Sequence, residues 1–217
     1  MDAIELDTPR ECGWFFMKKI VAYSVFMLTI ATLASANGFN PRVLVVYYSR
    51  EGHTKLVAEK LASRFNADLE RLIDKKDRVG PLAVMAAGRD ALNGSLTEIG
   101  PLTHDPLNYD IVLVGTPSWF GNVTPAVRTF LSQYRLLGKT VGLFGTAHLT
   151  GVEHALEETT QLIGPPGTNF PRLPLRHRDL SDATLREKIE IFHKEVMDAY
   201  QSLQHVLAKA DNFLLKK

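Results

Sequence analysis

The chain has 217 residues, of which 45% are hydrophobic and 23% are charged, and its formal net charge is +1. This balance is typical of a globular protein with a sizeable core, and it excludes a disordered, collagen-like or coiled-coil chain. Near neutrality also argues against a nucleic-acid partner. The one cysteine, Cys12, precedes the predicted domain, which excludes a disulfide framework, a cysteine metal site and a catalytic cysteine there, and we expect no metal.

The first 36 residues follow the order of a secretory signal. The basic pair Lys18–Lys19 precedes an uncharged apolar run over residues 20–33, and small residues follow up to Ala36. This order predicts cleavage after Ala36 and export to the periplasm. It divides the chain into an N-terminal extension, 1–36, and a folded domain, 37–217.

Two further points about the N-terminus stay open. The stretch before Met17 is acidic and does not fit a signal, which makes Met17 a second candidate for the start of the protein. A membrane anchor over residues 20–39 is the alternative to cleavage, although the Ser, Thr and Asn residues in this stretch make it a weak membrane span.

From Arg42 onward, apolar runs typical of buried strands alternate with amphipathic segments typical of helices. We expect strands over 43–48, 68–73, 110–115, 140–144 and 169–175, and helices over 54–65, 81–92, 123–134, 151–163 and 182–207. Strands that alternate with helices predict an α/β doubly wound fold, with one five-stranded parallel sheet and helices on both faces. Ligands of such sheets bind outside the carboxyl ends of the strands, so the loops after the three buried strands form the candidate site.

The loop after the first strand is suited to a phosphate group. It opens a helix, whose free N–H groups and positive dipole end attract anions. Gly52 lets the backbone approach a ligand, and the hydroxyls of Ser49 and Thr54 add hydrogen-bond donors. The loop matches neither a Walker loop nor a dinucleotide fingerprint. An ordinary turn with Thr54 as the helix cap is the alternative. The candidate residues are Ser49, Arg50, Glu51, Gly52, His53 and Thr54.

The loops after the next two buried strands carry an aromatic pair and a histidine. The second loop contains Thr116, Pro117, Ser118, Trp119, Phe120, Gly121 and Asn122, and the third contains Ala147 and His148. An exposed Trp119 is costly unless a flat ligand covers it. The alternative is that Trp119 folds back as a lid on the core. His148 is a stronger candidate than most loop histidines because its loop lies at the same edge of the sheet as the other two.

Through residues 43–54, 110–131 and 139–150, the chain from Arg42 to about Tyr200 resembles the flavodoxin family. The resemblance implies the strand order 2-1-3-4-5 and non-covalent binding of FMN. It implies that the first loop holds the FMN phosphate and that the second and third loops bracket the isoalloxazine ring. Where the family usually has Thr or Ser, this chain has Arg50, Glu51 and His53, so backbone contacts to the phosphate are expected there.

The resemblance leaves two main classes of function. One is an NAD(P)H-dependent FMN oxidoreductase that reduces quinones or similar small-molecule acceptors. The other is an electron carrier that docks to a redox partner protein, and carriers tend to be acidic around the flavin. Here the domain is near neutral and the ring-side loops contain no Asp or Glu. His148 is the candidate catalytic residue, because a cationic imidazole stabilises the two-electron reduced anion. The sequence favours the oxidoreductase and leaves a homo-oligomer open.

Two N-glycosylation sequons begin at Asn93 and Asn122. A glycan on Asn122 would occupy the predicted flavin site. We therefore expect a bacterial export route rather than one through the endoplasmic reticulum.

Overall fold

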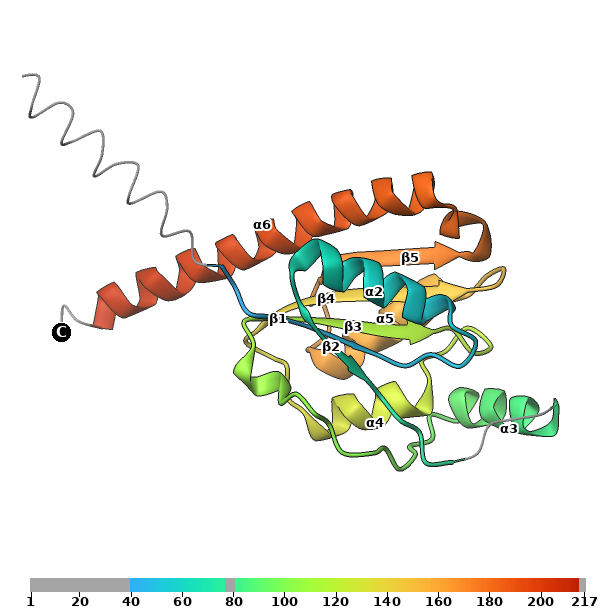
Figure 1. The fold of residues 1–217 in the computed structure, drawn as a ribbon. Helices are drawn as coiled ribbons and strands as arrows, with labels where there is room; N and C mark the ends of the chain where they lie inside the picture. Colours follow the sequence, from blue (N-terminus) through green and yellow to red (C-terminus); the bar gives the residue numbers. More distant parts are fainter. Residues whose placement is uncertain (1–39, 77–80, 215–217) are drawn as a thin grey trace, which may run out of the picture. The chain divides into compact units, whose positions relative to one another are not determined.

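Five strands form one parallel sheet in the order β2-β1-β3-β4-β5 (Figure 1). The strands are β1 (Val43–Tyr47), β2 (Asp68–Arg71), β3 (Ile111–Pro117), β4 (Thr140–Ala147) and β5 (Arg172–Arg176). The helices are α2 (His53–Phe65), α3 (Pro81–Leu92), α4 (Pro125–Gln133), α5 (Val152–Ile163) and α6 (Asp182–Leu214), with short 3-10 helices η1 (Pro106–Asn108) and η2 (His177–Leu180). The predicted fold class and strand order are confirmed.

The structure is a computed structural model that describes residues 40–76 and 81–214, and it describes the side chains in these ranges except at 81–84 and 211–214. The predicted signal, the alternative anchor and both candidate starts precede residue 40 and lie outside these ranges. Within the described ranges, no helix has both the length and the apolar composition that a membrane crossing requires.

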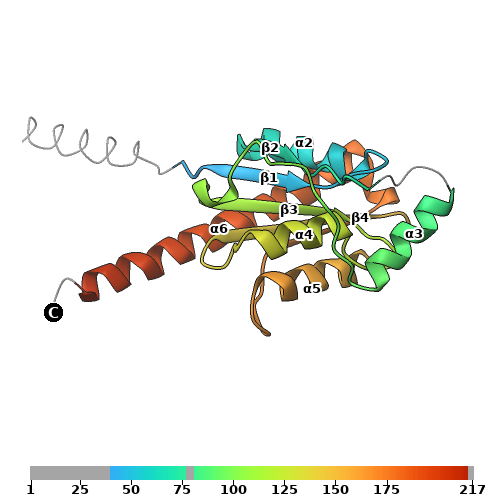
Figure 2. The same cartoon turned by 90° about the horizontal axis from the view of Figure 1, so that it is seen from below.

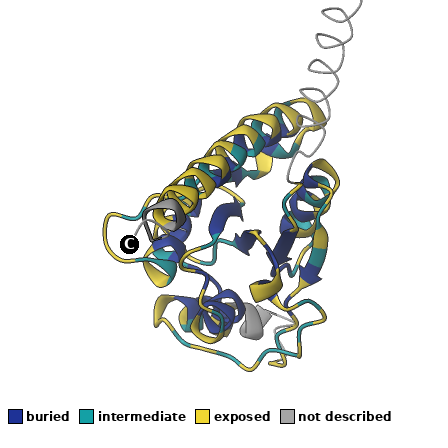
Figure 3. Ribbon diagram, turned by 90° about the vertical axis from the view of Figure 1, so that its left-hand side faces the viewer, coloured by how far each residue is buried: buried dark blue, intermediate teal, exposed yellow. Residues whose placement is uncertain are grey.

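Two helices cover each face of the sheet (Figure 2). On one face, Leu61 of α2 and Phe192 of α6 share a core with Val45 of β1. On the other face, α4 and α5 share a core with Val46, the next residue of β1. Successive side chains of a strand point to opposite faces, so a strand buried on both sides needs an unbroken apolar run. Figure 3 shows the result, with the sheet and the inner faces of the helices buried and the outer faces exposed.

Two strands extend further toward the ligand edge than the sequence predicts. β3 continues through Thr116 and Pro117, and β4 continues through Ala147. The two extensions pair with each other, with Thr116 opposite Gly145 and Pro117 opposite Thr146. Pairing with a neighbouring strand overrides the weak strand preference of Gly and Pro. The last helix also continues beyond the predicted end at 207 and reaches Leu214.

Candidate functional site

The carboxyl ends of β1, β3 and β4 border a pocket of about 240 Å³. All three loops that the sequence singles out contribute to its wall. The prediction ended the strand at residue 144 and placed Thr146 in the third loop, but did not count its hydroxyl among the binding groups. The pocket is lined by Ser49, Arg50, Glu51, His53, Thr54, Pro117, Ser118, Trp119, Thr146, Ala147 and His148.

Five of the predicted binding residues lie beside the pocket rather than on its wall: Gly52, Thr116, Phe120, Gly121 and Asn122. Thr116 is buried, and its hydroxyl donates to the Pro117 carbonyl oxygen at 2.9 Å. The hydroxyl oxygen of Thr116 accepts the N–H of Thr124 at 3.3 Å, so Thr116 connects the end of β3 to the start of α4. Gly52 shapes the first loop, and the other three residues form a turn.

The first loop has the geometry of an anion site. Gly52 precedes α2 with a φ of 98°, in the left-handed region that favours glycine. It forms no side-chain cap, so the N–H groups of the first helical turn stay available to an anion. Thr54 is not the cap that the alternative prediction required. Its hydroxyl lies 2.8 Å from the hydroxyl of Thr146, and both side chains are buried.

The one fixed cation of the first loop is already engaged. Arg50 forms an ion pair with Glu51, the next residue. The guanidinium carbon also lies 5.7 Å from the ring centroid of Trp119, within the range of a cation–π contact. The Trp119 ring meets Tyr48 edge-on, with centroids 5.6 Å apart. Trp119 is half-buried and packs partly against the core, while it also lines the pocket.

A strained turn carries the other aromatic residue of the second loop. Trp119 and Asn122 exchange two backbone hydrogen bonds of 3.0 Å. The two residues between them, Phe120 and Gly121, have φ values of 50° and 86°. Positive φ at both central residues suits a two-residue hairpin turn but is unusual for a phenylalanine. Phe120 is 67% exposed, and its ring lies against Gly88 of α3, where an added Cβ would come within 2.0 Å of the ring.

One buried polar atom on the pocket wall is unsatisfied. Ser118 Oγ has no hydrogen-bond partner among the described residues. Buried hydroxyls are nearly always paired, so a polar ligand beside Trp119 would complete Ser118. The anion site, the aromatic side chain and this hydroxyl together fit a ligand that joins a phosphate to a flat polar ring.

Comparisons with known proteins agree with this geometry. A family model described as flavodoxin matches residues 85–190. A flavoprotein from Lactobacillus acidophilus, solved in complex with FMN, superposes with a TM-score of 0.52 at 25% identity and covers 64% of this chain and 96% of that one. The chain carries a flavodoxin-like domain. The family resemblance that the sequence predicted is therefore confirmed.

Two curated relatives carry the name NAD(P)H dehydrogenase (quinone). The relative from Acidithiobacillus ferrooxidans is 32% identical over 125 residues, which are 55% of this chain and 62% of that protein. The relative from Cupriavidus metallidurans is 34% identical over 128 residues, which are 55% of this chain and 61% of that protein. The chain thus spans about three fifths of the length of these relatives.

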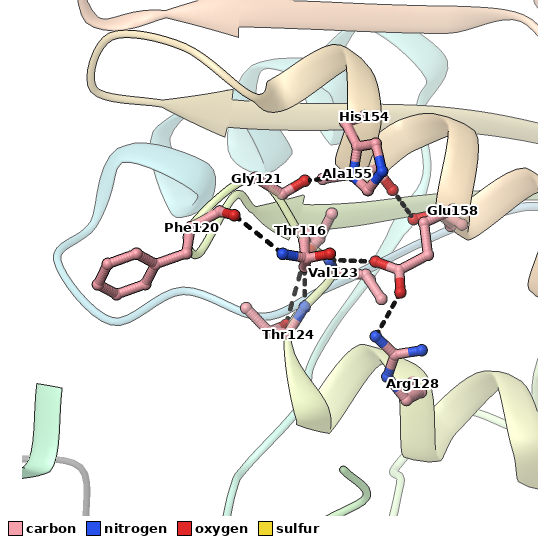
Figure 4. Close-up of polar contacts among 11 residues, drawn as sticks. Thr116, Phe120, Gly121, Val123, Thr124, Arg128, His154, Ala155 and Glu158 are labelled. Atoms are coloured by element: carbon pink, nitrogen blue, oxygen red, sulfur yellow. Dashed lines mark hydrogen bonds and ion pairs between the residues drawn. The ribbon is translucent and has the colours of Figure 1, made fainter. Parts of the chain in front are cut away.

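A partly buried ion pair between Arg128 and Glu158 lies next to the second loop of the flavodoxin-like domain (Figure 4). Glu158 of α5 accepts the N–H of Val123 at 2.8 Å and a guanidinium N–H of Arg128 at 2.6 Å. His154, one turn earlier on α5, has its Nδ1 2.9 Å from the carbonyl oxygen of Gly121. These contacts attach the C-terminal side of the Phe120 turn, at Gly121 and Val123, to α5, and the residues of α5 that make them do not line the pocket.

The third loop brings His148 into a cluster that the sequence prediction missed. Ala147 pairs with Arg176 across β4 and β5, so the residues that follow, His148 and His177, emerge side by side. Their ring centroids lie 5.2 Å apart, and His177 also lies 5.3 Å from His53. The pairing of β4 with β5 is the feature that would have placed His177 next to His148, had the register been known. In the part of the chain that the structure describes, no set of three or more His, Cys, Asp or Glu side chains is arranged to hold a metal ion.

Proposed function

We propose that the flavodoxin-like domain binds FMN non-covalently in this pocket and acts as an NAD(P)H-dependent oxidoreductase for quinones or similar small acceptors. The observation that carries the proposal is the pocket itself. It joins an uncapped helix start at Gly52 to an aromatic wall at Trp119, with the unsatisfied hydroxyl of Ser118 beside it. The names of the curated relatives and the FMN bound to the Lactobacillus flavoprotein support the same assignment.

Different residues of the pocket bind the phosphate and the ring of the cofactor. The N–H groups at the start of α2, with the hydroxyls of Ser49 and Thr54, bind the phosphate. Trp119 packs against the ring, and Ser118 supplies a hydrogen bond to it. Bound FMN supplies hydride and electron transfer between the nicotinamide donor and the acceptor. His148 stands at the third loop, where a protonated imidazole balances negative charge on the reduced ring.

The charges around the pocket favour an oxidoreductase over a carrier protein. Among the described residues that line the pocket, Glu51 is the one carboxylate, and its charge is paired with Arg50. A docking carrier presents unpaired carboxylates around its flavin to attract a basic partner. The described residues of the pocket wall include no unpaired carboxylate. The pocket therefore suits an uncharged quinone better than a basic partner protein.

The test is reconstitution of the full chain with FMN, followed by turnover assays. We expect a stable yellow complex that releases FMN on acid treatment. With NADH or NADPH as donor, it should reduce a soluble quinone at a rate proportional to bound FMN, and His148→Ala should lower that rate. A tight FMN complex that reduces no quinone with either donor would instead support the electron-carrier function.

We also propose that the protein is exported, on the signal-like order of residues 18–36. The proposal rests on the sequence pattern. Mass spectrometry of the native protein should find an N-terminus at Asn37. An intact Met1 or Met17 on soluble protein would contradict cleavage, and an intact terminus in the membrane fraction would support the anchor.

A further inference from the structure

Three histidines from separate parts of the chain meet at one side of the pocket. His53 is the first residue of α2, His148 follows β4, and His177 begins η2. His177 contacts both other rings, with centroid distances of 5.3 Å to His53 and 5.2 Å to His148. Two of these rings, His53 and His148, line the pocket itself. We call the three side chains the imidazole cluster.

Charged groups surround the imidazole cluster, but the carboxylates among them have other partners. Glu51 pairs with Arg50, and Glu153 pairs with Arg176. Asp179 accepts the backbone N–H of Arg176 at 2.8 Å and lies 3.2 Å from the Lys188 ammonium. Within the described ranges, none of the three imidazoles has a carboxylate at ion-pair distance. Charged groups on the neighbouring loops and elements include Lys55, which pairs with Glu59 on α2, and Arg71, whose guanidinium donates to the Ser49 carbonyl oxygen at 3.2 Å. The others are Arg50, Glu51, Glu153, Arg176, Arg178, Asp179 and Lys188.

The FMN phosphate needs positive charge that the first loop does not supply. A phosphate monoester carries a charge of about −1.5 to −2 at neutral pH. Arg50 is already paired with Glu51, and the dipole of α2 contributes only about half a positive charge. A bound anion favours the protonated form of a nearby imidazole, and histidine is the side chain that can take up a proton near neutral pH.

We propose that His177, held between His53 and His148, completes the phosphate end of the flavin pocket, and that its pair with His53 takes up a proton when the FMN phosphate binds, while His148 stays at the ring end. The inference rests on the proposed function, since it requires that FMN occupies the pocket. It assigns a binding role to the segment after β5, which none of the three predicted loops includes.

The proposal predicts an affinity for FMN that falls as the pH rises. If one proton is taken up with the phosphate, the dissociation constant rises by up to about tenfold per pH unit once the free histidines are neutral. The titration should cover about pH 6.5 to about pH 9, where the phosphate stays mostly a dianion. Riboflavin, which has the same ring and no phosphate, should show a flat profile. Quenching of flavin fluorescence measures the dissociation constants of FMN and riboflavin. Calorimetry in buffers of different ionisation enthalpy gives the number of protons taken up on binding.

Two substitutions separate charge from packing at His177. His177→Ala should weaken FMN binding several-fold at about pH 6.5 and flatten its pH profile. His177→Arg should keep the affinity for FMN at high pH, because a guanidinium stays charged. His205→Ala, on the exposed end of α6, is the matched control and should leave both ligands and both profiles unchanged.

The outcomes distinguish this inference from the proposed function. If the full chain binds FMN with the same flat pH profile as riboflavin, the imidazole cluster does not serve the phosphate and the inference is wrong, while FMN binding stands. If both His177 variants weaken FMN and riboflavin equally, His177 acts through packing, and the inference is again wrong. If the chain binds FMN at no pH, the proposed function itself fails.

Discussion

The two ends of the pocket are built in different ways. Apart from the imidazole rings, the proposed phosphate end consists mainly of backbone and short hydroxyl side chains, with Gly52 before α2 and the hydroxyl pair of Thr54 and Thr146 behind it. The ring end consists of large side chains, with Trp119 between Tyr48 and Arg50 and Phe120 against Gly88. Backbone geometry follows from local sequence, whereas contacts between large side chains depend on how distant elements pack. The phosphate end should therefore be rigid and selective, and the ring end should be adjustable.

The largest expected effect comes from the hydroxyl pair. Thr54→Val removes a hydroxyl next to the proposed phosphate position, a loss of about 1.5–3 kcal/mol for a hydrogen bond to a charged group. FMN should bind roughly tenfold more weakly or worse, while riboflavin should bind as before. Fluorescence titration with both flavins measures the difference.

The matched control for this substitution is Thr160→Val. Thr160 is also buried, and its hydroxyl donates to the Leu156 carbonyl oxygen at 3.0 Å within α5, away from the pocket. It should cost similar stability without changing either affinity. Equal weakening of FMN and riboflavin by Thr54→Val would show that the hydroxyl pair supports the fold rather than the phosphate.

A second test compares two glycines that each lie under a phenylalanine ring. An added Cβ would come within 2.1 Å of Phe144 at Gly115 and within 2.0 Å of Phe120 at Gly88. Phe144 is fully buried, so Gly115→Ala should overpack the core and cost about 1–3 kcal/mol. Phe120 is exposed and can move aside, and alanine favours the helix by up to about 1 kcal/mol, so Gly88→Ala should leave the stability unchanged or raise it slightly.

Denaturant unfolding of the two alanine variants measures this contrast. A large loss of stability in Gly88→Ala would mean that the ring end is as rigid as the core. It would contradict the expectation that the ring end is the adjustable end of the pocket. If stability holds, a change in the relative rates of bulky and small quinones would locate Phe120 beside the acceptor.

The features that the sequence predicted are local ones, and those it did not predict depend on contacts between distant parts of the chain. The parallel sheet and the candidate anion loop followed from apolar runs, a glycine and a helix start, all of which are local features, whereas the strand order came from the family resemblance. Thr146 lay in the predicted third loop but was not counted among the binding residues, since its place on the pocket wall depends on its pairing opposite Pro117. His177 was missed because it reaches the site through the pairing of Ala147 with Arg176. The contact of Phe120 with Gly88 joins a loop to a helix distant in sequence, and no local pattern encodes it.

Substitution of Trp119 should have a smaller effect on flavin affinity than substitution of Thr54, and it should affect FMN and riboflavin alike. Removing the ring in Trp119→Ala should cost about 0.5–1.5 kcal/mol of stacking. FMN and riboflavin should weaken equally, by roughly two- to tenfold, because both carry the same ring. Trp119→Phe keeps an aromatic face and is the control. A loss confined to FMN would place Trp119 at the phosphate end and contradict its proposed position beside the ring.

The smallest effect concerns the segment that carries His177. Burial raises the pKa of Asp179, but the hydrogen bond from the Arg176 N–H and the charge of Lys188 outweigh burial, so the pKa of this carboxyl is lowered. A lowered pKa in the folded state means that the ionised carboxylate stabilises the fold above its unfolded pKa of about 3.9. This contribution is lost as the pH falls through the lower, folded value. Asp179→Asn keeps the acceptor for Arg176 and removes the charge, at an expected cost on the order of 0.5–1 kcal/mol near neutral pH.

The pH dependence of this cost identifies its origin. Below the folded pKa of Asp179 the native carboxyl is neutral as well, so the native chain and Asp179→Asn should unfold at the same urea concentration in strong acid and diverge as the pH rises. Because Asp179 fixes the start of η2, the variant should also bind FMN slightly more weakly than the native chain at neutral pH, with riboflavin unaffected. A stability difference that persists unchanged into acid would show that the amide disturbs the turn itself, and the charge on Asp179 would then have no part in holding His177 at the phosphate end.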